Sequence, residues 1–450
     1  MTGHLFRALS LALILTGCAA PPSLGPAPDM ALQTRALSSQ ALFGAPQPQP
    51  TQTPNAQIVL DILELGFALE SGREIAQLSR FEGAITLRLT GTLPPLAAVE
   101  TDRLLARLRR EAGLDIRRQD GPANITVEFV PRATMRRSVP DASCFVVPNV
   151  ASWDEFRSSL RGAGPNWAET VERKRVLVVA PSDATVQEMR DCLHEEVAQA
   201  LGPLNDLYRI AGTVWNDDNF QTVLTGYDML VLRAWNDPAL RSGMSKAEVA
   251  RRLPAILARL NLRGARGSAA APSPTSRDWV DAVEGALSAP APARSYTLAS
   301  RALGLAVDAG WQDARLAFSL FLAARFAPPA RGAEALEALI QASRLYGALP
   351  DGAKARAYVD LHLSAQALGA KQYSVVLDLT ARAMTAAKNA ENGALLSSLM
   401  LLRAQALAAQ GNTAQADRLR RDAGPYALYG FGSDKAAAAR RDEIALLARP

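Results

Sequence analysis

Residues 191–206 read DCLHEEVAQALGPLND, and this stretch decides which fold the sequence predicts. Ser182 or Asp183 can cap the free backbone N–H groups where a helix would begin, and Gly202-Pro203 is typical of a helix end. The sequence therefore predicts one long helix that ends at Leu201. A polar loop follows it, as far as about Leu224.

Strand and helix patterns alternate around this helix. Alternating apolar and polar residues predict strands over 85–89 and 124–130, and residues 144–147 and 175–180 are further strand candidates. Helical periodicity begins at Ile58 and Pro94, and capping-box spacings predict helices after Thr225 and Ser245. This order predicts a mixed α/β layer over residues 56–263.

The last part of the chain is rich in Ala, Leu and Arg and has no strand pattern. AQAL at 365–368 recurs at 404–407, and each copy ends a predicted helix. This pattern resembles tetratricopeptide-type helical repeats, in which neighbouring hairpins stack into a solenoid. A non-repeating α-bundle is the alternative. The predicted fold class is α+β, with an all-α helical-repeat domain over 293–450 after a linker, 264–292, that contains a short helix.

Composition excludes several classes of function. The 450 residues are 48% apolar and 21% charged, with a formal net charge of +5. Basic residues are interleaved with acidic ones and form no concentrated face with aromatic platforms, so we predict no nucleic-acid partner. The sequence has no phosphate-binding loop and no CxxC. Beyond the first 17 residues only His194 and His362 remain, too few for a three-histidine metal site.

The amino terminus predicts export and lipid attachment. His4 and Arg7 precede a short apolar run and then Leu15-Thr16-Gly17-Cys18. This resembles a bacterial lipoprotein signal, with a signal peptide over 1–17 and lipid on Cys18. Ala19 after the cysteine implies the outer membrane, with the protein facing the periplasm, and the Pro/Gln-rich residues 18–55 predict a tether. An ordinary leader with a chance cysteine is the alternative.

Two further cysteines, Cys144 and Cys192, are available for pairing. An exported compartment permits a disulfide between them. Two separate buried thiols are the alternative.

The long helix carries a displaced peptidase motif. His194-Glu195 begins HExxH, but Ala198 stands where the second histidine belongs. One residue later, Glu195, Glu196, Gln199, Gly202 and Asn205 align with HExxHxxGxxH of the metzincin peptidases, especially matrixin-like ones. Thr213-Val214-Trp215 and Leu224-Thr225-Gly226-Tyr227-Asp228 occupy that family's S-I-M turn and L-T-x-x-D segment. The resemblance implies a degenerate zincin-like domain with Glu196 at the general-base position.

A closer resemblance is to a proteobacterial envelope family catalogued as domain of unknown function 2927. It rests on RDCLHEEVAQALGPLNDLYRI, WNDDNF, LTGYDMLVLRAW and RSGM, and it spans roughly 58–263. This resemblance implies that the chain is a member of that family, and it does not indicate which activity the chain has.

Two functional hypotheses follow. The first is a non-catalytic binding or scaffolding lipoprotein whose helical repeats contact an unidentified protein partner, with no cofactor. The second is a metal-dependent hydrolase with Glu196 as base and zinc or calcium held by atypical ligands: His194, Glu195, Gln199, Asn205 and Asp206. The polar residues near the helix end, which include Asn216, Asp217 and Asp218, either bind a polar ligand or a cation such as Ca²⁺, or cap the helix and hold the turn.

Overall fold

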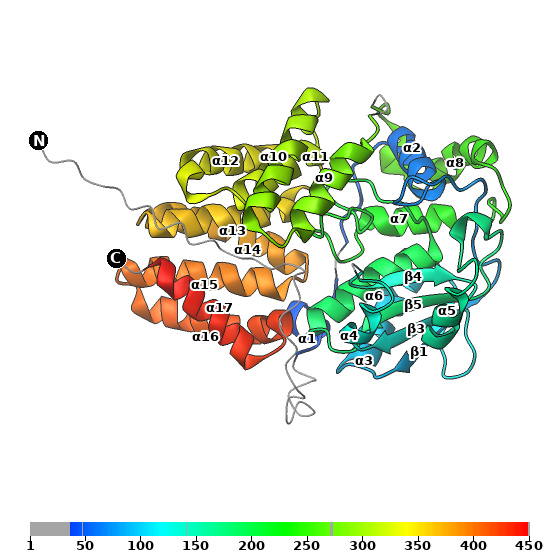
Figure 1. Cartoon of the computed structure of the whole chain (residues 1–450), viewed down its shortest axis with the longest axis horizontal. Helices are drawn as coiled ribbons and strands as arrows, with labels where there is room; N and C mark the ends of the chain where they lie inside the picture. The colour runs from blue at the N-terminus through cyan, green and yellow to red at the C-terminus, as the bar shows by residue number, and fades with distance from the viewer. Residues whose placement is uncertain (1–36, 47, 141, 271–272, 449–450) are drawn as a thin grey trace, which may run out of the picture.

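The computed structural model describes residues 37–46, 48–140, 142–270 and 273–448. The predicted signal peptide and Cys18 lie outside these residues. A mixed α/β domain is followed by an all-helical stacked region over 277–447, as Figure 1 shows. The predicted fold class is therefore confirmed. Within the described ranges, no helix combines the length and the apolar character that crossing a membrane requires.

The mixed domain is built on a five-stranded sheet of order β2-β1-β3-β5-β4. The strands are β1 (Ile85–Gly91), β2 (Ile116–Arg118), β3 (Ile125–Val130), β4 (Phe145–Pro148) and β5 (Val176–Pro181). The pairs β1–β2, β1–β3 and β3–β5 are parallel, and β4 runs antiparallel to β5 at one edge. Every residue of β5 is buried, as is typical of a strand with both faces covered.

Helices cover both faces of this sheet. They are α2 (Asn55–Gly66), α3 (Ala97–Glu111), α4 (Arg132–Met135), α5 (Trp153–Ser159), α6 (Val186–Leu201), α7 (Gly226–Trp235) and α8 (Lys246–Leu260). Val176, Val178 and Ala180 of β5 join the main core with α6, whereas Leu177 and Val179 face a smaller core with α5. The predicted long helix is α6, which follows β5 in the chain and packs against the sheet.

The two ends of α6 are fixed by side chains. Thr185 caps its start, and Glu188 completes a capping box, so the prediction of Ser182 or Asp183 as the cap was wrong. At the other end Arg173 donates to the carbonyl oxygens of Gln199, Ala200 and Gly202 at 2.7 to 2.8 Å. Arg173 is buried, and burial lowers its pKa to about 9. It satisfies carbonyls that the helix itself leaves unpaired.

The helical region stacks its consecutive helices against one another. It comprises α9 (Arg277–Ser288), α10 (Pro292–Asp308), α11 (Ala314–Arg325), α12 (Gly332–Ala348), α13 (Ala353–Gly369), α14 (Tyr373–Asn389), α15 (Gly393–Ala409), α16 (Thr413–Phe431) and α17 (Asp434–Leu447). The two AQAL copies lie in the last turns of α13 and α15. After each copy, and before the next helix begins, one residue has a positive φ: Lys371 after the first copy and Gly411 after the second.

A short amino-terminal helix, α1 (Ser39–Phe43), lies within the predicted tether and is docked on the protein. The Ser39 backbone N–H donates to Glu100 of α3 at 2.8 Å. Phe43 packs against Tyr426 and Tyr429 of α16, with ring centroids 5.5 and 5.6 Å away. This part of the predicted tether therefore contacts both the mixed domain and the helical region, which the sequence did not predict.

The helical region is joined to the mixed domain by a buried group of charges at the turn between α14 and α15. Arg103 of α3 donates to both carboxylate oxygens of Glu391, at 2.6 and 2.8 Å. Arg190 of α6 donates to the main-chain oxygen of Glu391 at 2.8 Å and pairs with Asp191. In this arginine-paired cluster (Arg103, Arg190, Asp191, Glu391), each carboxylate faces a guanidinium.

Candidate functional site

The C-terminal half of α6 holds a group of carboxyls. Glu195 and Glu196 lie on the helix, Asp206 and Asp217 come from the loop after it, and Glu70 comes from the segment after α2. We call these five residues the carboxyl cluster. The Gln199 amide donates to Glu70 Oε1 at 3.2 Å. Glu196 and Gln199 are buried, with only 4% and 6% of their surfaces exposed.

These carboxyls raise one another's pKa. Loss of hydration, reinforced by the Asp217 charge, raises the pKa of Glu70, which keeps an exposed surface, to about 7 and that of the half-buried Glu195 to about 8. Burial and the neighbouring glutamates hold the pKa of Glu196 well above its usual range. Burial and the other four carboxyls do the same for Asp206. The charges that act on these four groups come from other carboxylates, so the neutral acid forms are favoured.

Two oxygens of the carboxyl cluster lack a partner. Glu196 Oε2 and Asp206 Oδ1 are buried and accept or donate no hydrogen bond among the described residues. Asp217 differs, because its carboxylate accepts from the Tyr208 hydroxyl at 2.9 Å. A general base must be ionised and must reach the proton that it removes. The burial and raised pKa of Glu196 oppose that role in this structure.

The structure places two predicted metal ligands elsewhere. His194 is buried, and its Nδ1 accepts a hydrogen bond from the Leu224 backbone N–H at 3.1 Å. Burial, with Arg107 and Arg190 nearby, keeps its pKa well below the usual range. The Asn205 amide donates to the main-chain oxygen of Glu64 at the end of α2, at 3.2 Å. Both side chains hold neighbouring segments in place.

A resident metal does not fit the side chains near α6. Among the residues that the structure describes, no three or more His, Cys, Asp or Glu are placed to hold a metal ion. Zinc prefers imidazole, thiolate and ionised carboxylate ligands. Here the histidine is turned away and the glutamine amide is hydrogen-bonded to Glu70.

The polar loop residues after α6 bond mainly within their own loop. Asn216 donates to the main-chain oxygen of Ile210 at 2.7 Å and to Asp218 at 3.0 Å. The Phe220 backbone N–H donates to Asp218 at 2.9 Å. These are the turn-holding hydrogen bonds that Asn and Asp commonly form. Asn216 and Asp218 therefore stabilise the loop, whereas Asp217 points into the carboxyl cluster.

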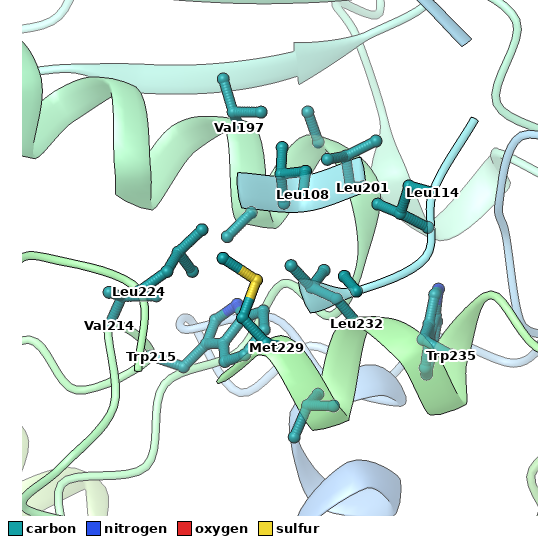
Figure 2. Close-up of a cluster of buried hydrophobic side chains, with 14 of the residues drawn as sticks. Leu108, Leu114, Val197, Leu201, Val214, Trp215, Leu224, Met229, Leu232 and Trp235 are labelled. Atoms are coloured by element: carbon teal, nitrogen blue, oxygen red, sulfur yellow. The ribbon is translucent and has the colours of Figure 1, made fainter. Parts of the chain in front are cut away.

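The two segments aligned with the peptidase turn and the last-helix motif contact each other. Thr213 donates to Asp228 at 2.6 Å, and Asp228 also accepts from the Thr225 backbone N–H at 2.7 Å. Trp215 is fully buried and donates to the main-chain oxygen of Pro203 at 3.2 Å. Figure 2 shows Trp215 beside Met229 of α7, beneath the apolar residues of α3 and α6. This core packs against the C-terminal end of α6.

The predicted disulfide is present. Cys144, next to the edge strand β4, bonds to Cys192 on α6, with the two Cα atoms 6.0 Å apart. The bond links the edge of the sheet to the helix one turn before the carboxyl cluster.

The helical region seals the loop that follows α6. Tyr208 packs edge-on against Trp279 of α9, with centroids 5.1 Å apart, and Phe220 stacks on Tyr358 of α13 at 4.5 Å. Both loop aromatics belong to the core of the helical region. Lys354 of α13 is also buried here and donates to Gln221. The loop that would carry the third metal ligand in the peptidase alignment is therefore part of the contact between the two regions.

Comparison with protein families places the first of these regions. Residues 55–255 match the model of the family described as "Protein of unknown function (DUF2927)". These residues form a DUF2927 domain. The domain runs from the first residue of α2 into α8, and it contains the whole sheet, α6 and the carboxyl cluster. No curated protein and no solved structure matches the chain.

Sequence reasoning missed two residues that shape this site. Glu70 lies 129 residues before Gln199 on a segment without a motif, and nothing in the sequence links the two. Arg173 directly precedes a predicted strand, and its role at the end of α6 depends on the way the chain folds back. Its only local signal is the charged run Glu172-Arg173-Lys174-Arg175 before an apolar strand.

Proposed function

We propose that this protein is a non-catalytic binding or scaffolding lipoprotein of the cell envelope. In this proposal the DUF2927 domain is a rigid platform and the helical region carries the surface for a protein partner. The observation that carries the proposal is the state of Glu196. The carboxyl at the aligned general-base position is buried, lacks a partner at Oε2 and is surrounded by other carboxyls.

The contacts around α6 support an inherited scaffold without its former chemistry. The aligned turn and last-helix segments are joined through Thr213 and Asp228, so the supporting contacts are intact. The aligned ligand positions at Gln199 and Asn205 are used in hydrogen bonds within the domain. This proposal includes a metzincin-like origin of the domain and a repeat character of α9–α17. Fold analogy alone does not establish function.

The envelope location is proposed from the leader alone. We propose that Cys18 carries lipid and that the protein faces the periplasm from the outer membrane. The Cys144–Cys192 disulfide is in keeping with an oxidising compartment. Replacing Cys18 with Ser should abolish lipid labelling and release the protein from membranes. Unchanged membrane fractionation without lipid would refute the anchor.

A metal-dependent hydrolase is the rival, and one observation favours it. Glu196 Oε2 is a buried oxygen without a partner, as a base waiting for a water or metal would be. The test is the metal content of purified residues 19–450, measured by mass spectrometry together with peptidase activity on labelled casein. We expect metal far below one ion per chain and no activity above that of the Glu196→Gln variant. Stoichiometric metal that disappears in the Glu195→Ala, Gln199→Ala double variant would contradict the proposal.

A further inference from the structure

The helical region contains a groove with two arginines whose hydrogen-bonding capacity is only partly used. The groove lies where the turn between α12 and α13 meets α14 and has a volume of about 330 Å³. Arg356 of α13 and Arg382 of α14 line it, together with the small residues Gly347, Ala353 and Ala386. Their side chains are 33% and 43% exposed, so the guanidinium groups are accessible to a ligand.

One buried carboxylate orients both arginines. Arg382 donates through Nε and Nη2 to the two oxygens of Asp360, at 2.7 and 2.8 Å, and Asp360 is almost fully buried. Arg356 donates through Nε to Ser343 at 3.2 Å and lies 3.9 Å from Asp360. Both Nη atoms of Arg356 and Nη1 of Arg382 have no partner within the described residues. At this end of the groove two guanidiniums lie beside one buried carboxylate, and the charge of Asp378 also acts on Arg382.

We propose that this groove binds a carboxylate carried by an extended acidic segment of a partner protein. Guanidinium N–H groups in a fixed fork match the two oxygens of a carboxylate, and such charge-assisted pairs are among the stronger polar contacts. Asp360 and Ser343 hold the arginines in place, so little further ordering is needed on binding. This inference rests on the proposed function, because it names the chemistry of the partner for the helical region.

A second groove continues the path and sets the register of the segment. It has a volume of about 730 Å³ and shares Leu349 and Asp351 with the first groove. Its far wall includes Arg263, which forms no ion pair among the described residues, and the extended residues 49–52. Asp351 at the junction disfavours an acidic side chain there. The matching segment therefore has its acidic group at the Arg356 end and neutral residues across Asp351.

The test uses purified residues 19–450 and two fluorescein-labelled probes. One is a hexapeptide of four alanines followed by Asp and Glu with a free carboxyl end, and the other is its Asn-Gln amide. We expect saturable binding of the acidic probe by fluorescence anisotropy and at least about tenfold weaker binding of the amide, which corresponds to about 1.4 kcal/mol. Equal binding of both probes, or binding of neither, would overturn the proposal.

Two variants and one control locate the binding. Arg356→Gln leaves the Arg382–Asp360 pair intact and should weaken the acidic probe about tenfold. Arg344→Gln, an exposed arginine of α12 outside the groove, should leave binding unchanged. Should Arg356→Gln disturb folding, Ala386→Asp places a repelling carboxylate on the half-buried groove wall and should also abolish binding. Unchanged binding in Ala386→Asp would overturn the site, and neither result depends on the metal content that tests the proposed function.

Discussion

Two groups of carboxyls gather around α6, one near its start and one near its end, in opposite surroundings. Toward its start, Asp191 and Glu391 each face an arginine, and the resulting arginine-paired cluster joins the DUF2927 domain to the helical region. Toward its end, no arginine or lysine of the described residues forms an ion pair with the carboxyl cluster, and Glu196 Oε2 and Asp206 Oδ1 lack hydrogen-bond partners. The carboxylates of the first group are paired with guanidiniums, whereas the carboxyls of the second group raise one another's pKa.

The largest effect should come from breaking the arginine-paired cluster. Arg190→Ala removes a fully buried guanidinium and leaves Asp191 and Glu391 with one partner fewer. Loss of one member of a buried ion pair typically costs about 3–5 kcal/mol. Urea unfolding should show this loss, and Arg110→Ala, an exposed arginine on α3, should change the free energy of unfolding by less than about 0.5 kcal/mol. Equal midpoints for the two variants would show that the cluster does not stabilise the junction.

The disulfide should have the next largest effect. Cys144 and Cys192 are 48 residues apart, and closing a loop of that length stabilises a fold by about 4 kcal/mol at most on the chain-entropy model, with measured values of about 2–4 kcal/mol. The Cys144→Ser, Cys192→Ser double variant should lose this stability in urea. Adding reductant should lower the midpoint of the wild type and leave that of the variant unchanged. A reductant effect of the same size in both proteins would argue against this bond as the cause.

The carboxyl cluster should make stability depend on pH in a defined direction. The folded-state pKa values of Glu70 and Glu195, about 7 and about 8, lie above the ordinary value of 4.5. The folded state therefore holds protons that the unfolded chain releases, and stability falls as pH rises from about 4.5 to about 8. Thermal midpoints across this range should decline less steeply in the Glu70→Gln, Glu195→Gln variant. Parallel declines in variant and wild type would exclude these two groups as the source.

The smallest effect should come from Glu196 itself. Glu196→Gln replaces a carboxyl that favours its neutral form with a neutral group of the same shape. The free energy of unfolding should therefore stay within about 0.5 kcal/mol or rise slightly at neutral pH. Glu188→Gln is the matched comparison on the same helix, because it removes a negative charge from the first turn of α6 and should cost about 0.3–1 kcal/mol. A destabilisation by Glu196→Gln larger than that of Glu188→Gln would indicate an ionised Glu196 with an unseen partner.

Local sequence signals predicted most of the fold. Gly202-Pro203 ended α6 where expected, and Thr225 and Ser245 capped α7 and α8 through the predicted boxes. The cap of α6 was misplaced because three polar residues precede that helix and only the structure shows Thr185 bonded to Glu188. The docked helix α1 was missed because a five-residue helix in a Pro/Gln-rich segment depends on Glu100 and Tyr426 elsewhere in the chain.

The site was less predictable than the fold, because its members meet through long-range contacts. Glu195, Glu196, Gln199 and Asp206 were named from one contiguous stretch, and the structure places them together. His194 and Asn205 belong to the same stretch, but His194 lies on another face and Asn205 bonds to α2. Glu70 carries no local signal at all. Spacing along one helix indicates which residues share a face, and it cannot show what the remaining chain brings opposite them.

The protonation of Glu196 is the most direct test of the account. Infrared difference spectra of the mature protein at neutral pH, wild type against Glu196→Gln, report whether this residue contributes a protonated carboxyl C=O band or an ionised carboxylate band. We predict a protonated band that disappears in Glu196→Gln and persists in Glu188→Gln. An ionised Glu196 at neutral pH, shifting on addition or removal of zinc, would contradict a non-catalytic scaffold.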